Sequence, residues 1–187
     1  MPAVGIVLAA GAGRRFGQPK ATVVQDGRSW LNLAVEALAA GGCAEVVVVL
    51  GAEEDEARTL LDGDVRVVVA EDWADGLSAS LRRGLEAIED APATVDCAVV
   101  TLVDLPDVDA AVIGRVLAAA EGPTTLLRSV YQGRPGHPVV LGRAHWDAVR
   151  TTVVGDRGAR DYLEAHAARG IECGDLAGGH DVDVRPA

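Results

Sequence analysis

The chain has 187 residues, a formal net charge of −11 at pH 7 and a composition that is 49% hydrophobic and 24% charged. This size fits a single domain, 1–187, and the acidity excludes a nucleic acid as partner, because that partner requires a basic face. No apolar run is long enough to span a membrane, and the N-terminus lacks the basic region of a signal peptide. The three cysteines are odd in number and far apart, so we expect a cytoplasmic protein with reduced thiols and no membrane contact.

Strand and helix patterns alternate along the chain. Short apolar runs predict strands at 4–8, 46–50, 65–70, 98–103, 125–130 and 139–141, with a final extended piece at 181–184. Apolar residues at helical spacing predict helices at 29–40, 53–61, 77–88, 110–120, 144–150 and 159–168. Residues 133–138 are interpreted as a turn-rich insertion. The alternation predicts a Rossmann-like α/β fold with a mostly parallel central sheet, helices on both faces and an antiparallel excursion in the second half.

The segment after the first strand carries the strongest functional signal. It reads Leu8-Ala9-Ala10-Gly11-Ala12-Gly13-Arg14-Arg15-Phe16-Gly17-Gln18-Pro19-Lys20. Its glycines allow close approach to a ligand, its successive N–H groups can hold an anion, and Arg15 and Lys20 add positive charge. We predict a triphosphate cradle at the carboxyl end of the first strand, with a plain glycine-rich turn as the alternative. The glycine and lysine spacing matches neither a P-loop nor a dinucleotide-binding fingerprint.

This segment, L-A-A-G-x-G-x-R-x-G-x-x-K, resembles the signature of the MobA/MocA-like NTP transferase family, which transfers nucleotides to the molybdenum cofactor. The resemblance runs nearly end to end and implies a fold like that of nucleotide-diphospho-sugar transferases. Segments 71–82, 136–138 and 155–160 resemble the cytidylyl branch, as does the Ala9-Ala10 pair. The residues that the resemblance assigns to the nucleotide are Leu8, Ala9, Ala10, Gly11, Gly13, Arg15, Lys20, Ser78 and Ser80.

Two aspartates are candidate metal ligands. Asp104 directly follows the strand 98–103 and therefore lies at the same rim of the sheet as the glycine loop. Mg²⁺ takes one or two carboxylates together with phosphate oxygens and water, so Asp104 suits it, with a turn or N-cap role as the alternative. The resemblance to the family's D-x-D-T-P segment places the second ligand at Asp183, with Asp181 as fallback, although Val184-Arg185-Pro186 replaces Thr-Pro-acid here. A solvated acidic tail is the alternative for Asp183.

Ser78 and Ser80 lie at a predicted helix start, where side-chain oxygens and free N–H groups can read a nucleotide base. The alternative for Ser78 is a plain helix cap. Three tryptophans are predicted to be packing anchors. They are Trp30, Trp73 and Trp146.

By family analogy, His137 and Arg157 line the pocket of the acceptor, whose phosphate an arginine would bind. A structural role for His137 remains open. So does a surface pairing of Arg157 with Asp156 or Glu164.

The resemblance implies nucleotidyl transfer, in which the phosphate of molybdopterin attacks the α-phosphorus of CTP and pyrophosphate leaves. Arg15, Lys20 and Asp104 would be catalytic, and Asp104 and Asp183 would hold Mg²⁺. GTP is the rival nucleotide. The chain could instead be an NAD(P)H-dependent oxidoreductase of the nicotine-blue type, which this family also includes, or a non-catalytic nucleotide-binding partner of a molybdoenzyme.

Overall fold

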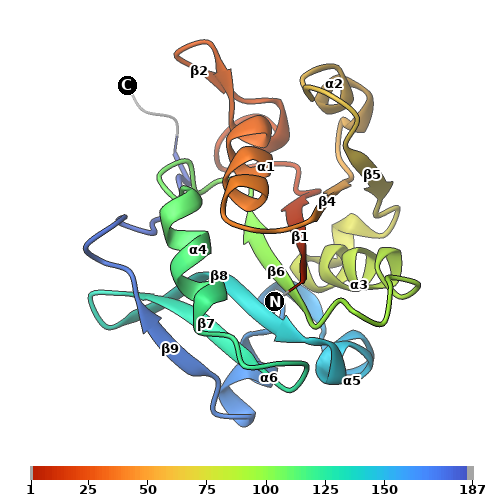
Figure 1. The fold of residues 1–187 in the computed structure, drawn as a ribbon. Helices are drawn as coiled ribbons and strands as arrows, with labels where there is room; N and C mark the ends of the chain where they lie inside the picture. The colour runs from red at the N-terminus through yellow and green to blue at the C-terminus, as the bar shows by residue number, and fades with distance from the viewer. Residues whose placement is uncertain (1, 185–187) are drawn as a thin grey trace.

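A seven-stranded sheet forms the centre of the protein in a computed structural model that describes residues 2–184 (Figure 1). The strand order is β5-β4-β1-β6-β8-β7-β9, and only β8 runs antiparallel to its neighbours. The strands are β1 (Ala3–Ala9), β4 (Glu45–Leu50), β5 (Arg66–Val69), β6 (Cys97–Leu102), β7 (Leu126–Tyr131), β8 (Arg134–Gly142) and β9 (Arg169–Glu172). A separate hairpin joins β2 (Val24–Gln25) to β3 (Arg28–Ser29). The predicted Rossmann-like fold with a mostly parallel sheet is confirmed.

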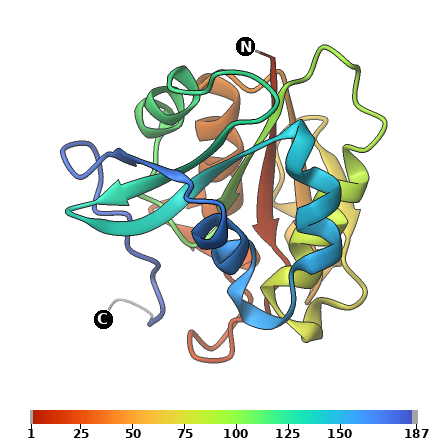
Figure 2. The ribbon, with the colours of Figure 1, turned by 90° about the horizontal axis from the view of Figure 1, so that it is seen from below.

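Helices cover both faces of the sheet (Figure 2). They are α1 (Trp30–Ala40), α2 (Glu54–Thr59), α3 (Leu77–Ala87), α4 (Ala110–Ala118), α5 (Trp146–Thr152) and α6 (Arg160–Ala165). Alternate residues of β1 point to opposite faces, as a strand requires. Ala3 and Val7 pack with α1 and α4, whereas Val4 and Ile6 pack with α3, α5 and α6. No helix in the described part of the chain is long and apolar enough to cross a membrane.

Local sequence signals explain where several elements begin. The side chain of Ser29 caps α1 by accepting a hydrogen bond from the N–H of Leu31. The carboxylate of Asp109 caps α4 in the same way. Both helices therefore start where their first free N–H groups find a partner.

The interpretation of residues 133–138 as an insertion is wrong, because the turn is confined to Gln132 and Gly133, and β8 starts at Arg134. Two prolines in this stretch suggested a turn. They are tolerated because the first half of β8 pairs only with β7, and pairing with β6 begins at Val139.

Three further features differ from the prediction. The strand β9 was not predicted, and α6 ends at Ala165 rather than at residue 168. Edge strand β9 is short and mostly exposed, so it lacks the apolar alternation that would reveal it. The segment 181–184 forms no strand, although the N–H of Val182 donates to the carbonyl of Asp104 over 3.1 Å.

Candidate active site

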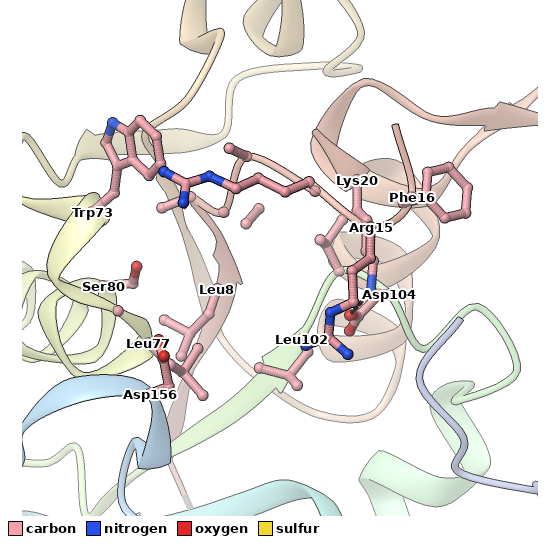
Figure 3. A pocket seen from close by; sticks show the side chains of 18 of the residues that line it. Leu8, Arg15, Phe16, Lys20, Trp73, Leu77, Ser80, Leu102, Asp104 and Asp156 are labelled. Carbon is pink, nitrogen blue, oxygen red and sulfur yellow. Dashed lines mark hydrogen bonds and ion pairs between the residues drawn. The ribbon is translucent and has the colours of Figure 1, made fainter. Parts of the chain in front are cut away.

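A cleft of about 600 Å³ lies at the carboxyl ends of β1 and β6, where open α/β sheets bind ligands. Every residue from Leu8 to Phe16 lines it, so the predicted triphosphate loop forms one wall. Figure 3 shows Lys20, Arg15 and Asp104 gathered on one side, and Trp73, Ser80 and Asp156 on the other. Ligand pockets typically measure roughly 300–1,000 Å³, so the cleft is large enough for a nucleotide.

Gly13 sets the shape of the loop. Its φ is +58°, in the left-handed region, and its carbonyl accepts a hydrogen bond from the N–H of Gly17 over 2.8 Å. A Cβ at Gly13 would lie 1.8 Å from the carbonyl oxygen of Gln18, whereas a Cβ at Gly11 would meet no protein atom within 4 Å. Gly13 is required by the loop itself, and Gly11 leaves space on the ligand side.

We expect Gly13→Ala to lower the free energy of unfolding by about 1–3 kcal/mol, because the loop must rearrange to remove the clash. The matched variant Gly11→Ala should unfold at the wild-type denaturant concentration and lose only nucleotide affinity. Chemical denaturation without ligand, followed by calorimetric titration with CTP, separates the two effects. Equal stability of both variants would contradict this account of the loop.

Lys20 contacts carboxylates from two distant parts of the chain. It begins the short 3₁₀ turn η1 (Lys20–Thr22), and its Nζ donates to Asp104 Oδ2 over 2.7 Å and to Asp183 Oδ1 over 3.1 Å. Burial alone would lower the pKa of Lys20, but hydrogen bonds and charges from Asp104 and Asp183 outweigh it and raise that pKa. Lys20 is therefore an ammonium ion between two carboxylates.

The donor set of this cluster suits a hard divalent cation. The side chain of Asp104 is 15% exposed, and its buried Oδ1 has no hydrogen-bond partner among residues 2–184. A buried carboxylate oxygen without a partner is costly, and a cation would satisfy it. Asp183 supplies a second carboxylate beside the same ammonium. These residues therefore fit the predicted magnesium site.

The two aspartates near the end of the described chain, Asp181 and Asp183, line two different cavities. Asp183 lines the cleft and lies 3.4 Å from the guanidinium of Arg15, whose side chain is 84% exposed. Asp181, the fallback metal ligand, lines a neighbouring pocket instead. Of the two aspartates, Asp183 is the one that reaches Lys20.

The start of α3 forms the wall of the cleft opposite Lys20. Ser80 lines the cleft, but Ser78 does not: its side chain is fully buried, and its Oγ has no hydrogen-bond partner among the described residues. A capping role for Ser78 is also wrong, because Gly76 occupies the N-cap position of α3. Asp156 lines the cleft beside Gly76; it lies in the segment 155–160 that resembles the cytidylyl branch, but it was considered only as a surface partner of Arg157.

Trp73 corrects another prediction. It is half-buried and lines the cleft rather than serving only as a packing anchor, whereas Trp30 and Trp146 are buried as predicted. The sequence shows that the chain has three tryptophans, but only the fold reveals which indole ring borders a cavity.

A second pocket of about 280 Å³ adjoins the cleft, and four residues line both cavities. They are Leu8, Leu77, Leu102 and Asp156. His137 and Arg157 line this second pocket, so the structure brings together the two residues predicted for the acceptor. It also adds Arg128 and Arg160, which sequence reasoning did not select.

His137 and Arg157, the two residues predicted to bind the acceptor, differ in how free their side chains are to contact a ligand. Burial, together with the charge of Arg160, lowers the pKa of His137 to about 4, so its ring is neutral at pH 7. Arg157 donates from Nε to both carboxylate oxygens of Asp161, at 2.7 and 2.8 Å. The alternative of a surface ion pair therefore holds for Arg157, but its partner is Asp161 rather than Asp156 or Glu164.

A parallel sheet with a glycine-rich loop, a lysine and two carboxylates around one cleft defines a nucleotide-binding α/β enzyme of the nucleotidyltransferase class. A sequence model of the MobA-like NTP transferase domain matches residues 5–170. The chain belongs to this family.

Individual relatives carry different activities. The chain is 37% identical to nicotine blue oxidoreductase of Paenarthrobacter nicotinovorans over 96% of its length and 91% of the relative. It is 40% identical to 2-C-methyl-D-erythritol 4-phosphate cytidylyltransferase of Rhodococcus jostii, but over 48% of the chain and 40% of that enzyme.

Solved structures share the fold. A homologue of Mycobacterium tuberculosis Rv0371c from Mycobacterium sp. strain JC1 superposes with a TM-score of 0.84 and 26% identity, over 97% of this chain and 90% of that one. Rv0371c itself has been solved in complex with manganese; its TM-score is 0.75 at 24% identity, over 92% of this chain and 89% of that one.

Proposed function

We propose that the protein is a Mg²⁺-dependent nucleotidyltransferase that transfers CMP from CTP to the phosphate of a molybdopterin acceptor. One observation carries this proposal: the glycine loop, Lys20 and the Asp104–Asp183 pair surround a single cleft. An oxygen of the acceptor phosphate forms a bond to the α-phosphorus, the bond from the α-phosphorus to the bridging oxygen breaks, and pyrophosphate leaves. A molybdoenzyme would then receive the dinucleotide cofactor.

The residues of the cleft act by positioning and by neutralising charge. Backbone N–H groups of the loop and the cations Arg15 and Lys20 bind the triphosphate, and Lys20 stabilises the charge that develops on pyrophosphate. Asp104 and Asp183 would hold Mg²⁺, which supplies Lewis-acid neutralisation of the phosphates when bound. The manganese in the Rv0371c structure supports a divalent cation in this fold.

The far wall of the cleft offers groups that can read a base. Ser80 and Asp156 face the cleft on the side away from Lys20 (Figure 3). A carboxylate accepts hydrogen bonds, so Asp156 suits a base with an exocyclic amino group, such as cytosine, better than uracil. The named activity of the Rhodococcus relative and the resemblance of Ala9-Ala10 to the cytidylyl branch also favour CTP.

Pyrophosphate release tests this function. With Mg²⁺, molybdenum-loaded molybdopterin and each nucleotide in turn, we expect release with CTP that is lost in Asp104→Ala. Pyrophosphate release with GTP alone would support nucleotidyl transfer but would make guanine, not cytosine, the base that the protein accepts. Nucleotide binding without release from any NTP would favour a non-catalytic binding protein.

A second candidate function is NAD(P)H-dependent reduction. The match to nicotine blue oxidoreductase over nearly the whole chain favours it. The glycine spacing, which differs from a dinucleotide-binding fingerprint, counts against it. Consumption of reduced nicotinamide with nicotine blue, in the absence of any NTP, would establish this activity.

A further inference from the structure

Most arginines in the described range have a hydrogen-bond or ion-pair partner within the protein, and three do not. The chain carries 28 acidic and 17 basic residues, so carboxylates are abundant. Among residues 2–184, most guanidinium groups hydrogen-bond or pair with a carboxylate, a carbonyl or a histidine ring, as Arg115 does with Asp175 and Arg143 with main-chain carbonyls. Within that described range, the arginines without such a partner are Arg14, Arg128 and Arg160.

All three of these arginines line a cavity. Arg14 lies in the nucleotide cleft, and Arg128 and Arg160 lie in the second pocket. Guanidinium groups that remain without a partner in so acidic a chain are available for an anion that is not part of the protein. In the cleft that anion is the triphosphate of the proposed function. The second pocket, predicted for the acceptor, has the same feature, but Arg128 and Arg160 have no assigned role there.

The second pocket combines this charge with an apolar wall. Arg128 comes from β7 and Arg160 from the start of α6, so two separate elements present the two guanidinium groups. Leu81, Val139 and Leu163 line this pocket and not the cleft. A ligand with an anionic end and an uncharged ring or chain would satisfy both surfaces.

The polar neighbours in the pocket are compatible with an anion. Burial and the charge of Arg160 lower the pKa of His137 against the opposing charge of Asp181, so the ring is neutral and can donate one hydrogen bond. Asp156 and Asp181 also line the pocket, but within the described chain neither forms an ion pair with Arg128 or Arg160. The arginines therefore retain their full donor capacity toward a ligand.

We propose that Arg128 and Arg160 bind the phosphate monoester of the second substrate, whose uncharged body packs on Leu81, Val139 and Leu163. A phosphate accepts several parallel N–H donors at once, which matches two guanidinium groups better than a single one. Arg157 is the less available donor in this pocket, because Asp161 already accepts hydrogen bonds from its Nε. The inference rests on the proposed function only in identifying the bound ester as the nucleotide acceptor.

Phenyl phosphate is a suitable probe, since it joins a phosphate monoester to an uncharged ring. We expect it to shift the methyl NMR signals of Leu81, Val139 and Leu163, and phenol to leave them unchanged. Arg128→Gln and Arg160→Gln should each weaken binding about tenfold or more, because each removes charge-assisted hydrogen bonds. Neither change breaks a hydrogen bond or an ion pair among residues 2–184, so both variants should fold.

Arg66→Gln is the matched control, because it removes the same charge at an exposed site outside both cavities and should leave the affinity unchanged. Two results would overturn the proposal: unchanged affinity in both Arg128→Gln and Arg160→Gln, or shifts confined to Ala12, which lines only the cleft.

The binding measurement requires neither nucleotide nor turnover, so it separates this inference from the proposed function. If binding follows Arg128 and Arg160 while no NTP yields pyrophosphate, the phosphate subsite stands and the transferase proposal fails. If pyrophosphate is released and the acceptor KM is the same in both variants as in the wild type, the subsite proposal fails alone.

Discussion

Replacing Lys20 with methionine is expected to lower kcat/KM for CTP by roughly 10²–10³-fold, the effect of removing one positioned donor from a developing charge. The side chain is 14% exposed and is fixed by two carboxylates, so its ammonium is held in place before a nucleotide arrives. Methionine keeps an unbranched side chain that is one atom shorter, and it removes the charge together with the N–H donors of Nζ. Steady-state pyrophosphate release at varied CTP measures the loss.

Arg66→Met provides the control for Lys20→Met. It also removes one positive charge, but Arg66 pairs with Glu45 at an exposed site on β5, outside both cavities of the proposed site. Its kinetics should match the wild type. A Lys20→Met variant that stays within about threefold of wild-type kcat/KM would remove Lys20 from the mechanism.

Asp104→Asn should have the larger effect, with a loss of activity of about 10³-fold or more. Metal ions contribute several kcal/mol to charge stabilisation in phosphoryl transfer, and about 4 kcal/mol corresponds to this factor. Asparagine has the same shape but no charge, and Lys20 retains its contact with Asp183. The fold should therefore persist, which circular dichroism can verify.

Metal binding provides a readout that is independent of turnover. Titration with Mn²⁺ in the presence of CTP, followed by electron paramagnetic resonance, should show weaker binding in Asp104→Asn and unchanged binding in Asp147→Asn. Asp147 carries the same group at an exposed position, where it pairs with Arg150. Unchanged Mn²⁺ affinity in Asp104→Asn would contradict the role of this carboxylate.

The sequence was informative where one physical signal dominates. Buried strands such as β4 and β6 are continuous apolar runs, so their positions could be predicted closely. The glycine loop was identified for a similar reason, because a plain turn requires no arginine or lysine beside its glycines. The order of the strands and the antiparallel β8 required the structure, because they depend on pairing between distant segments.

The candidate site shows where sequence reasoning stops. Arg128 belongs to no motif, Arg160 lies in the segment 155–160 without having been selected from it, and only the fold brings the two to the same pocket. Arg157 was favoured because it lies in a family motif, although a local i,i+4 partner occupies it. Ser78 and Ser80 looked equivalent in sequence, but two residues of helix correspond to about 200° of rotation. Both are buried, yet only Ser80, which is 4% exposed, lines the cleft.

The segment 178–183 is held in place mainly by polar contacts, and Val182 is its apolar residue that packs on the core. Asp107 accepts hydrogen bonds from the N–H groups of Gly178 and Gly179, one hydrogen bond joins Val182 to Asp104, and Asp183 pairs with Lys20 and Arg15. Segments with few buried apolar contacts open at a free energy below that of global unfolding. Opening of this segment would withdraw Asp183 from Lys20 while the sheet stays folded. The fraction of competent sites is thus set by a local equilibrium, which a melting curve of the whole protein does not report.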